Sequence, residues 1–182
     1  MFKDKNIVIG ITGGIAAYKA CEIVSYLVHQ GALVDVIMTN NACEFISPLT
    51  LETLSKHKVI TDMFEKKEHI EVEHISLARK ADLFLIVPAT ANIIGKVANG
   101  IADDMLSTTI MATDTKVVFA PAMNNGMYTN KIVQDNIRKL KKYGYEFIEP
   151  DTGNLACGYK AIGKLANKNK IIEYLENIFK EN

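Results

Sequence analysis

Residues 6–15 read NIVIGITGGI, in which the mostly apolar run Asn6–Ile11 passes directly into the turn Thr12-Gly13-Gly14. A short run that lacks polar alternation is typical of a strand covered on both faces by helices. A glycine pair straight after such a strand lets the backbone turn tightly into a following helix. This stretch therefore predicts the first strand–helix unit of a parallel sheet.

The same pattern recurs along the chain and sets the fold class. Four more short runs rich in Val, Ile, Leu or Phe predict strands at residues 33–38, 83–87, 117–120 and 145–148. Amphipathic or capped stretches predict helices between and after them, at residues 16–30, 47–55, 92–99, 105–112, 130–143 and around 171–179. This alternation predicts an α/β protein with a doubly wound parallel sheet, Rossmann-like or flavodoxin-like. Without a linker or repeat, we expect one three-layer domain over residues 1–182.

Composition excludes several classes of function. The 182 residues carry 21 Lys plus Arg and 21 Asp plus Glu, so no net charge favours nucleic acid or an anionic membrane. No apolar run has the length of a spanning helix, and the N-terminal apolar stretch is too short for a signal peptide. The three cysteines have neither C-x-x-C nor metal-ligand spacing. We therefore expect a cytoplasmic protein that binds no metal.

The segments that follow the predicted strands carry the unusual residues. The carboxyl ends of parallel strands meet at one edge of a sheet, which is where α/β proteins bind ligands. Small residues, hydroxyls, amides and a thiol gather there, at residues 12–15, 39–42, 88–92, 121–124 and 154–158. Five such segments together favour a binding site over a set of ordinary loops.

The glycine turn suggests the kind of ligand. The helix after Gly13-Gly14 would begin with unpaired backbone N–H groups, which attract phosphate, although a tight turn without a ligand explains two glycines equally well. The turn does not match G-x-G-x-x-G, and the second strand ends in Met38-Thr39-Asn40 without the carboxylate that holds a dinucleotide ribose. A P-loop motif is also missing. A mononucleotide such as FMN fits this pattern, whereas NAD and ATP fit poorly.

Two residues are candidates for proton transfer. His74 precedes a short stretch that leads into the third strand, and a histidine pKa near neutrality suits a base, although a surface or capping role is commoner. Cys157 lies beside a glycine in a polar loop, whereas Cys21 is placed as a small core residue of a helix. The pair Asp103-Asp104 is best explained as an N-cap and first-turn acid of the next helix.

An ordered set of motifs resembles one family, the homo-oligomeric flavin-containing cysteine decarboxylases. The matching segments, in family order, are GITGGIAAYK at 10–19, MTxxAxxF at 38–45, SPLTLE at 47–52, HIxL at 74–77, PATAN at 88–92, GIADD at 100–104, PAMNxxM at 121–127 and LACG at 155–158. They span nearly the whole chain. Within the family the chain is most similar to the branch of coenzyme A biosynthesis.

This resemblance implies an FMN-dependent lyase that decarboxylates 4′-phospho-N-pantothenoylcysteine to 4′-phosphopantetheine through a thioaldehyde and an enethiol. It implies His74 as the catalytic base and Cys157 as the proton donor. Residues implied to hold FMN are Thr12, Gly13, Gly14, Ile15, Thr39, Thr90, Ala91, Asn92, Ile93 and Ala122. Residues implied to hold the substrate are Asn124, Asn154, Leu155 and Ala156.

The resemblance also implies partners and leaves rivals open. It implies a homotrimer, or a dodecamer of trimers, with the flavin at a subunit boundary and residues 43–52 as a candidate contact. A separate synthetase would supply the substrate. After Ala-Cys-Gly the family often has Asp and a glycine-rich run ending in Arg; here residues 159–164 read YKAIGK, so Lys164 would supply the cation. The alternatives are a lantibiotic-type peptidyl-cysteine decarboxylase and a non-catalytic flavin-binding regulatory subunit.

Overall fold

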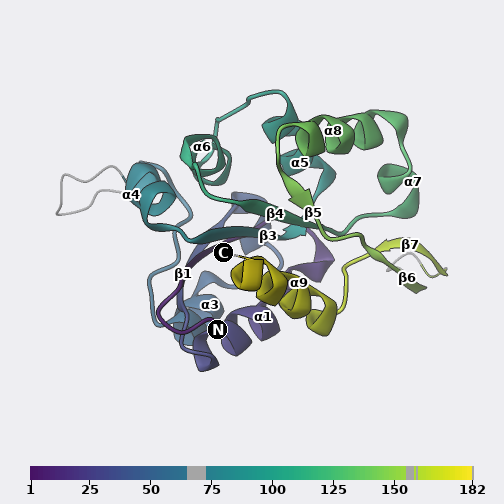
Figure 1. Ribbon diagram of the computed structural model, residues 1–182. Coiled ribbons are helices and arrows are strands. Elements are labelled where there is room, and N and C mark those ends of the chain that lie inside the picture. Colours follow the sequence, from purple (N-terminus) through teal and green to yellow (C-terminus); the bar gives the residue numbers. More distant parts are fainter. Residues whose placement is uncertain (65–72, 155–157, 159, 182) are drawn as a thin grey trace.

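A five-stranded parallel sheet between two helical layers forms the centre of the molecule (Figure 1). The computed structural model describes residues 1–64, 73–154, 158 and 160–181. The strands are β1 (Asn6–Ile11), β2 (Leu33–Met38), β3 (Leu83–Ala89), β4 (Val117–Pro121) and β5 (Glu146–Phe147), in the spatial order β2-β1-β3-β4-β5. This is the flavodoxin-like order of a doubly wound sheet. It confirms the predicted fold class and all five predicted strands: β1 and β2 have the predicted ends, and the ends of β3, β4 and β5 differ by at most two residues.

Each strand contributes side chains to both faces of the sheet. Along β1, Ile7, Ile9 and Ile11 face one core and Val8 faces the other, and all four are fully buried. Burial on both faces explains why the strand sequences are apolar throughout. The sheet is therefore held by two separate cores, one on each side.

The helices divide between the two layers. The first core is covered by η1 (Ile15–Lys19), α1 (Ala20–His29), α2 (Asn40–Cys43), α3 (Pro48–Ser55) and α9 (Lys168–Glu181). The second is covered by α4 (Glu73–Lys80), α5 (Ala91–Ala98), α6 (Met105–Ala112), α7 (Asn125–Tyr128) and α8 (Lys131–Lys142). The helix predicted at residues 16–30 is present, but its first turn is the 3-10 helix η1. This tighter turn follows directly from the glycine pair.

An antiparallel hairpin extends from the sheet near its carboxyl edge (Figure 1). It consists of β6 (Asp151–Asn154) and β7 (Lys160–Lys164), and the sequence pattern did not predict it. The backbone N–H of Met123, after β4, donates to the carbonyl of Gly163 at 2.9 Å. The hairpin is thereby joined to the loop that carries Ala122 and Asn124.

Two features are absent from the described residues. None of their helices combines the length and apolarity needed to cross a membrane. Their His, Cys, Asp and Glu side chains also form no group of three or more with the proximity that a metal ion needs.

Candidate functional site

Within the described part of the chain, two cavities lie at the carboxyl edge of the sheet, one on either side of the glycine turn. Gly13 lines one and Gly14 lines the other, so the turn itself separates them. Their volumes are about 430 and 490 Å³, within the usual range of small-molecule sites. We call them the threonine cavity and the lysine cavity, after the residues that distinguish them.

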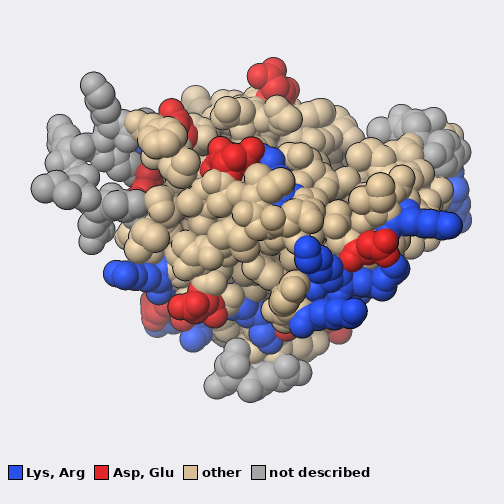
Figure 2. All heavy atoms as spheres, turned by 90° about the horizontal axis from the view of Figure 1, so that it is seen from above, with Lys and Arg blue, Asp and Glu red and all other residues tan. Residues whose placement is uncertain are grey.

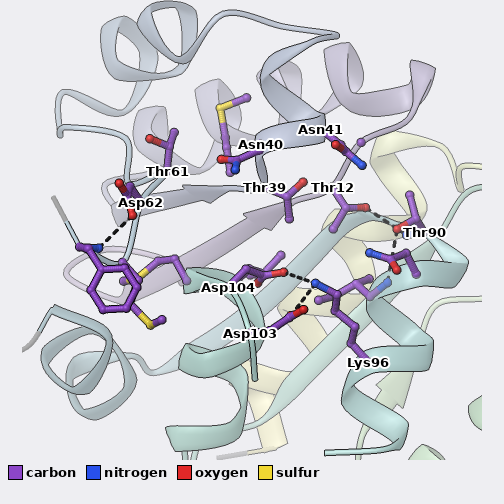
Figure 3. Close-up of a pocket in the computed structure, with 18 residues that line it drawn as sticks. Thr12, Thr39, Asn40, Asn41, Thr61, Asp62, Thr90, Lys96, Asp103 and Asp104 are labelled. Carbon is purple, nitrogen blue, oxygen red and sulfur yellow. Dashed lines mark hydrogen bonds and ion pairs between the residues drawn. The ribbon is translucent and has the colours of Figure 1, made fainter. Parts of the chain in front are cut away.

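The threonine cavity lies beyond the ends of β1, β2 and β3, against the starts of α5 and α6 (Figure 3). Its described lining is mainly polar and consists of Thr12, Gly13, Met38, Thr39, Asn40, Asn41, Thr61, Asp62, Met63, Phe64, Thr90, Asn92, Ile93, Lys96, Asp103, Asp104, Met105 and Leu106. Figure 3 shows Thr12, Thr39, Asn41 and Thr90 together at one end, apart from Asp62. Hydroxyl and amide groups thus gather where three strands end.

Thr12 joins two of the loops that form this cavity. Its side chain is buried, its hydroxyl donates to the carbonyl of Pro88 at 2.7 Å, and its oxygen accepts the backbone N–H of Thr90 at 3.1 Å. Thr90 in turn caps α5 by accepting the N–H of Ile93 at 3.5 Å. These bonds fix the end of β1 relative to the start of α5.

The close approach of two loops explains the glycine at position 13. A Cβ atom built on Gly13 would lie 2.4 Å from the Cβ of Asn41 and 2.8 Å from its carbonyl carbon. Any side chain there would separate the glycine turn from α2. Gly13 is thus required for the shape of the threonine cavity, whether or not a ligand is bound.

The groups present in this cavity fit a mononucleotide. Thr12, Thr39 and Thr90 supply hydroxyls, and the backbone N–H groups of Ala91 and Asn92 begin α5, where they have no partner inside the helix. Such an arrangement accepts a phosphate through oriented donors and leaves amides for polar ring edges. The structure therefore brings together six of the ten residues predicted to hold FMN, namely Thr12, Gly13, Thr39, Thr90, Asn92 and Ile93.

Lys96, which lines this cavity, is neutralised by two carboxylates. The Lys96 Nζ lies 2.6 Å from Asp103 Oδ1 and 2.6 Å from Asp104 Oδ2. Burial by itself would lower the pKa of Lys96, but the two carboxylates outweigh burial and raise it. Burial likewise opposes ionisation of Asp104, yet bonds from Lys96 and Ser107 hold its pKa below the usual value. Asp104 also caps α6, which confirms the predicted N-cap, but Asp103 precedes the cap, so the predicted first-turn acid is absent from α6.

The lysine cavity lies beyond β4, between η1 and the β6–β7 hairpin. Its described lining consists of Gly14, Ile15, Ala16, Tyr18, Lys19, Ala122, Met123, Asn124, Asn154, Gly163, Lys164 and Leu165. Five of the predicted site residues meet here, and they are Gly14, Ile15, Ala122, Asn124 and Asn154. The residues predicted for the cofactor are thus divided between the two cavities, and the described substrate residues lie in this one.

Five predicted site residues line neither cavity as described. His74 is half-buried in α4 and is not part of the described lining of either cavity. Cys157, Leu155 and Ala156 lie outside the described residues. Ala91 belongs to the threonine side as the first residue of α5. Its side chain is half-buried and is not in the cavity lining.

Sequence reasoning missed the charged residues Lys96 and Asp62 of the threonine cavity and Lys19 of the lysine cavity. Lys96 meets Asp103 and Asp104 only because α5 and α6 pack side by side, and no motif announces that contact. Tyr128 in α7 is a buried support: its hydroxyl donates to Glu149 at 2.6 Å, and burial together with that carboxylate raises its pKa.

The chain is similar to known proteins along its whole length. The model of the family described as Flavoprotein matches residues 1–180. A Borreliella burgdorferi protein named "Coenzyme A biosynthesis bifunctional protein CoaBC" is 55% identical over 181 residues, covering 100% of this chain and 46% of the relative. A Streptococcus mutans protein named "Probable phosphopantothenoylcysteine decarboxylase" is 44% identical over 174 residues, covering 94% of this chain and 97% of the relative. The chain spans about half the length of the CoaBC relatives it matches.

Solved structures of cysteine decarboxylases have a similar fold. A PPC decarboxylase variant complexed with pantothenoylaminoethenethiol superposes with a TM-score of 0.85 at 28% identity, covering 99% of this chain and 100% of the other. The FMN-dependent cysteine decarboxylase SpaF superposes with a TM-score of 0.83 at 28% identity, covering 96% of each chain.

Proposed function

This chain belongs to the flavoprotein family, and from that premise we propose that it is an FMN-dependent decarboxylase of 4′-phospho-N-pantothenoylcysteine in coenzyme A biosynthesis. One observation carries the proposal. The glycine turn places a polar cavity that suits a phosphate beside a second cavity lined by Asn124 and Asn154. A cofactor spanning the turn would have substrate next to it.

FMN is the proposed cofactor, held by the ten residues named for it above. When bound, it supplies a reversible two-electron acceptor, so that the substrate's thiol carbon can become a thioaldehyde that accepts the electrons released with carbon dioxide. The Thr12–Thr39–Thr90 end of the threonine cavity, which lies apart from Asp62, would hold the phosphate. Ile15 and Ala122 would contact the ring from the lysine cavity.

The chain's own residues would move the protons and hold the substrate. His74 would accept a proton as the substrate is oxidised, and Cys157 would donate one to the enethiol carbon after carbon dioxide has left. General acid or base assistance of this kind contributes roughly a hundred- to ten-thousand-fold. Asn124 and Asn154, with Leu155 and Ala156, would hold the pantothenoyl amide region.

A homo-oligomer, trimeric or built of trimers, is part of the proposal. His74 lies outside the described lining of both cavities, so we place it at the cavity of a neighbouring copy. Exposed apolar side chains support self-association: Phe45 and Leu49, within the candidate contact, are 49% and 68% exposed, and Ile15 at the lysine cavity is 61% exposed. Figure 2 shows, in addition, a face whose centre carries few charged residues.

We further propose that the chain forms a single domain and acts in the cytoplasm. The synthetase of the same pathway would supply its substrate. The peptidyl-cysteine decarboxylase remains the second candidate, because the solved structures that match include FMN-dependent cysteine decarboxylases such as SpaF. A regulatory subunit has no specific observation in its favour.

Turnover by the purified protein tests the function. It should show a flavin absorbance spectrum and release carbon dioxide from 4′-phospho-N-pantothenoylcysteine. Cys157→Ser should still release carbon dioxide but accumulate the enethiol, and His74→Asn should bind FMN and release none. A colourless, folded protein that does not take up FMN would refute the proposal, as would full turnover by His74→Asn.

Mixed oligomers test the placement of His74. Co-expressed His74→Asn and Asn124→Asp chains, each inactive alone, should regain part of the activity if the two residues of one site come from different copies. Mixed oligomers as inactive as the parent variants would instead place both residues on the same chain.

A further inference from the structure

The described lining of the lysine cavity includes two lysines and no carboxylate. Lys19 ends η1 and Lys164 ends β7, so the two lysines approach the cavity from different parts of the chain. No Asp or Glu is among its described lining residues. A chain without net charge therefore has a locally cationic cavity at its sheet edge.

Neither lysine has a carboxylate partner among the residues that the structure describes. Within the described residues, no ion pair involves Lys19 or Lys164, and Lys19 Nζ lies 5.9 Å from the centroid of the Tyr18 ring. Asp151, which pairs with Lys164 in the hairpin register, gives its carboxylate to Lys170 at 3.1 Å and to the N–H of Asn167 at 2.9 Å. Two ammonium groups thus remain available to an anionic ligand.

Gly153 helps to place one of these groups. The Lys164 side chain crosses Gly153 so closely that a Cβ built on the glycine would lie 2.8 Å from Lys164 Cδ and 3.4 Å from its Nζ. The lysine stem therefore packs on the hairpin backbone instead of extending freely into water. Such packing reduces the conformational entropy that the side chain would lose on binding.

The proposed substrate carries two anionic groups, and the reaction treats them differently. Its carboxylate is lost as carbon dioxide, so an ammonium ion bound to that group would stabilise the ground state more than the transition state and slow the reaction. Its phosphate is unchanged and carries a charge of about −1.5 to −2 at neutral pH. A pair of unneutralised lysines therefore suits the phosphate and not the reacting carboxylate.

We propose that Lys19 and Lys164 form the subsite for the substrate's 4′-phosphate and so select phosphorylated pantothenoylcysteine over cysteine substrates that lack a phosphate. This inference rests on the proposed function and extends it to specificity. Binding energy from the remote phosphate would hold the cysteine end in place without a cation at the scissile bond. A peptidyl-cysteine substrate would gain nothing from this subsite.

Steady-state release of carbon dioxide by FMN-loaded enzyme tests the subsite. Two substrates, 4′-phospho-N-pantothenoylcysteine and N-pantothenoylcysteine, are compared for the unmodified chain, Lys19→Gln, Lys164→Gln and the exposed control Lys131→Gln. A hydrogen bond to a charged group contributes about 1.5–3 kcal/mol, so each cavity variant should lose about 10- to 100-fold in kcat/KM for the phosphorylated substrate, chiefly through KM. Values for the unphosphorylated substrate should stay within about twofold, Lys164→Arg should retain most activity, and Lys131→Gln should be unaffected.

The outcomes separate this inference from the function beneath it. Equal losses on both substrates would overturn the phosphate subsite while leaving the decarboxylase intact. Loss of FMN from Lys19→Gln or Lys164→Gln would assign the lysines to the cofactor's phosphate and overturn it as well. If the unmodified, FMN-loaded protein decarboxylates neither substrate, the proposed function fails first.

Discussion

The threonine cavity and the lysine cavity share one sheet edge and one glycine turn, yet they differ in charge. In the threonine cavity Lys96 is held by two carboxylates, and Asp62 adds a third. In the lysine cavity Lys19 and Lys164 face no described carboxylate. Two adjacent cavities can therefore bind anionic groups by different means. The threonine cavity offers hydroxyls and backbone N–H groups, and the lysine cavity offers ammonium groups. Net charge, which is zero for the whole chain, says nothing about either.

The largest expected effect is a loss of stability at the lysine cavity. Gly163 has φ of +125°, and a Cβ on it would lie 2.3 Å from the Met123 carbonyl oxygen. Gly163→Ala should lower the free energy of unfolding by about 3 kcal/mol, because overpacking and backbone strain act together. Denaturant unfolding measures this loss. Gly14→Ala, on the same cavity with its Cβ 3.8 Å from the Thr90 methyl, is the matched control and should be close to neutral.

Thr12→Val should disturb the threonine cavity. It removes a buried hydroxyl that donates to the Pro88 carbonyl and accepts the Thr90 N–H, so both groups lose this partner. We expect a loss of about 2 kcal/mol in unfolding free energy and weaker FMN binding, measured by quenching of flavin fluorescence. Thr12→Ser keeps the hydroxyl and should retain both properties. A valine variant as stable as the serine variant would show that the two loops do not depend on this bond.

Lys96→Gln would increase the difference in charge between the two cavities by making the threonine cavity more anionic. Removal of the ammonium leaves Asp103 and Asp104 facing a cofactor that carries a phosphate. FMN should bind about tenfold more weakly at low ionic strength, with a smaller difference at high salt. The KM for phosphorylated substrate in FMN-saturated enzyme should not change, because the lysine cavity is untouched. A tenfold rise in that KM would mean that the two cavities act as one.

The smallest expected effect concerns pH. Because the pKa of Asp104 is lowered in the folded state, its contribution to stability is present above its unfolded pKa of about 4 and is lost as pH falls through the folded value. Asp104→Asn keeps an N-cap but should lose about 1 kcal/mol at pH 7 and none at strongly acidic pH. Chemical denaturation at a series of pH values measures the difference. A constant difference across the series would contradict the ion pair as its source.

Local sequence signals predicted much of the fold. The strands were found because burial on both faces demands apolar runs, and the Asp104 cap because helix starts favour such residues. The β6–β7 hairpin was missed because its strands are short and polar, and it depends on the bond between Met123 and Gly163. The 3-10 turn of η1 was also missed, because the apolar pattern of residues 16–30 favours an α-helix throughout.

By itself the sequence determined the sheet, the glycine turn at its first strand and the edge at which polar residues gather. These features follow from local rules: apolar runs, glycine conformations and the polarity of parallel strands. The folded structure was needed to show that this edge contains two cavities, that Lys96 is neutralised in one, and that Lys19 and Lys164 both line the other. The reason is physical: charge compensation depends on distances of a few ångströms between segments far apart in the chain, which packing alone sets.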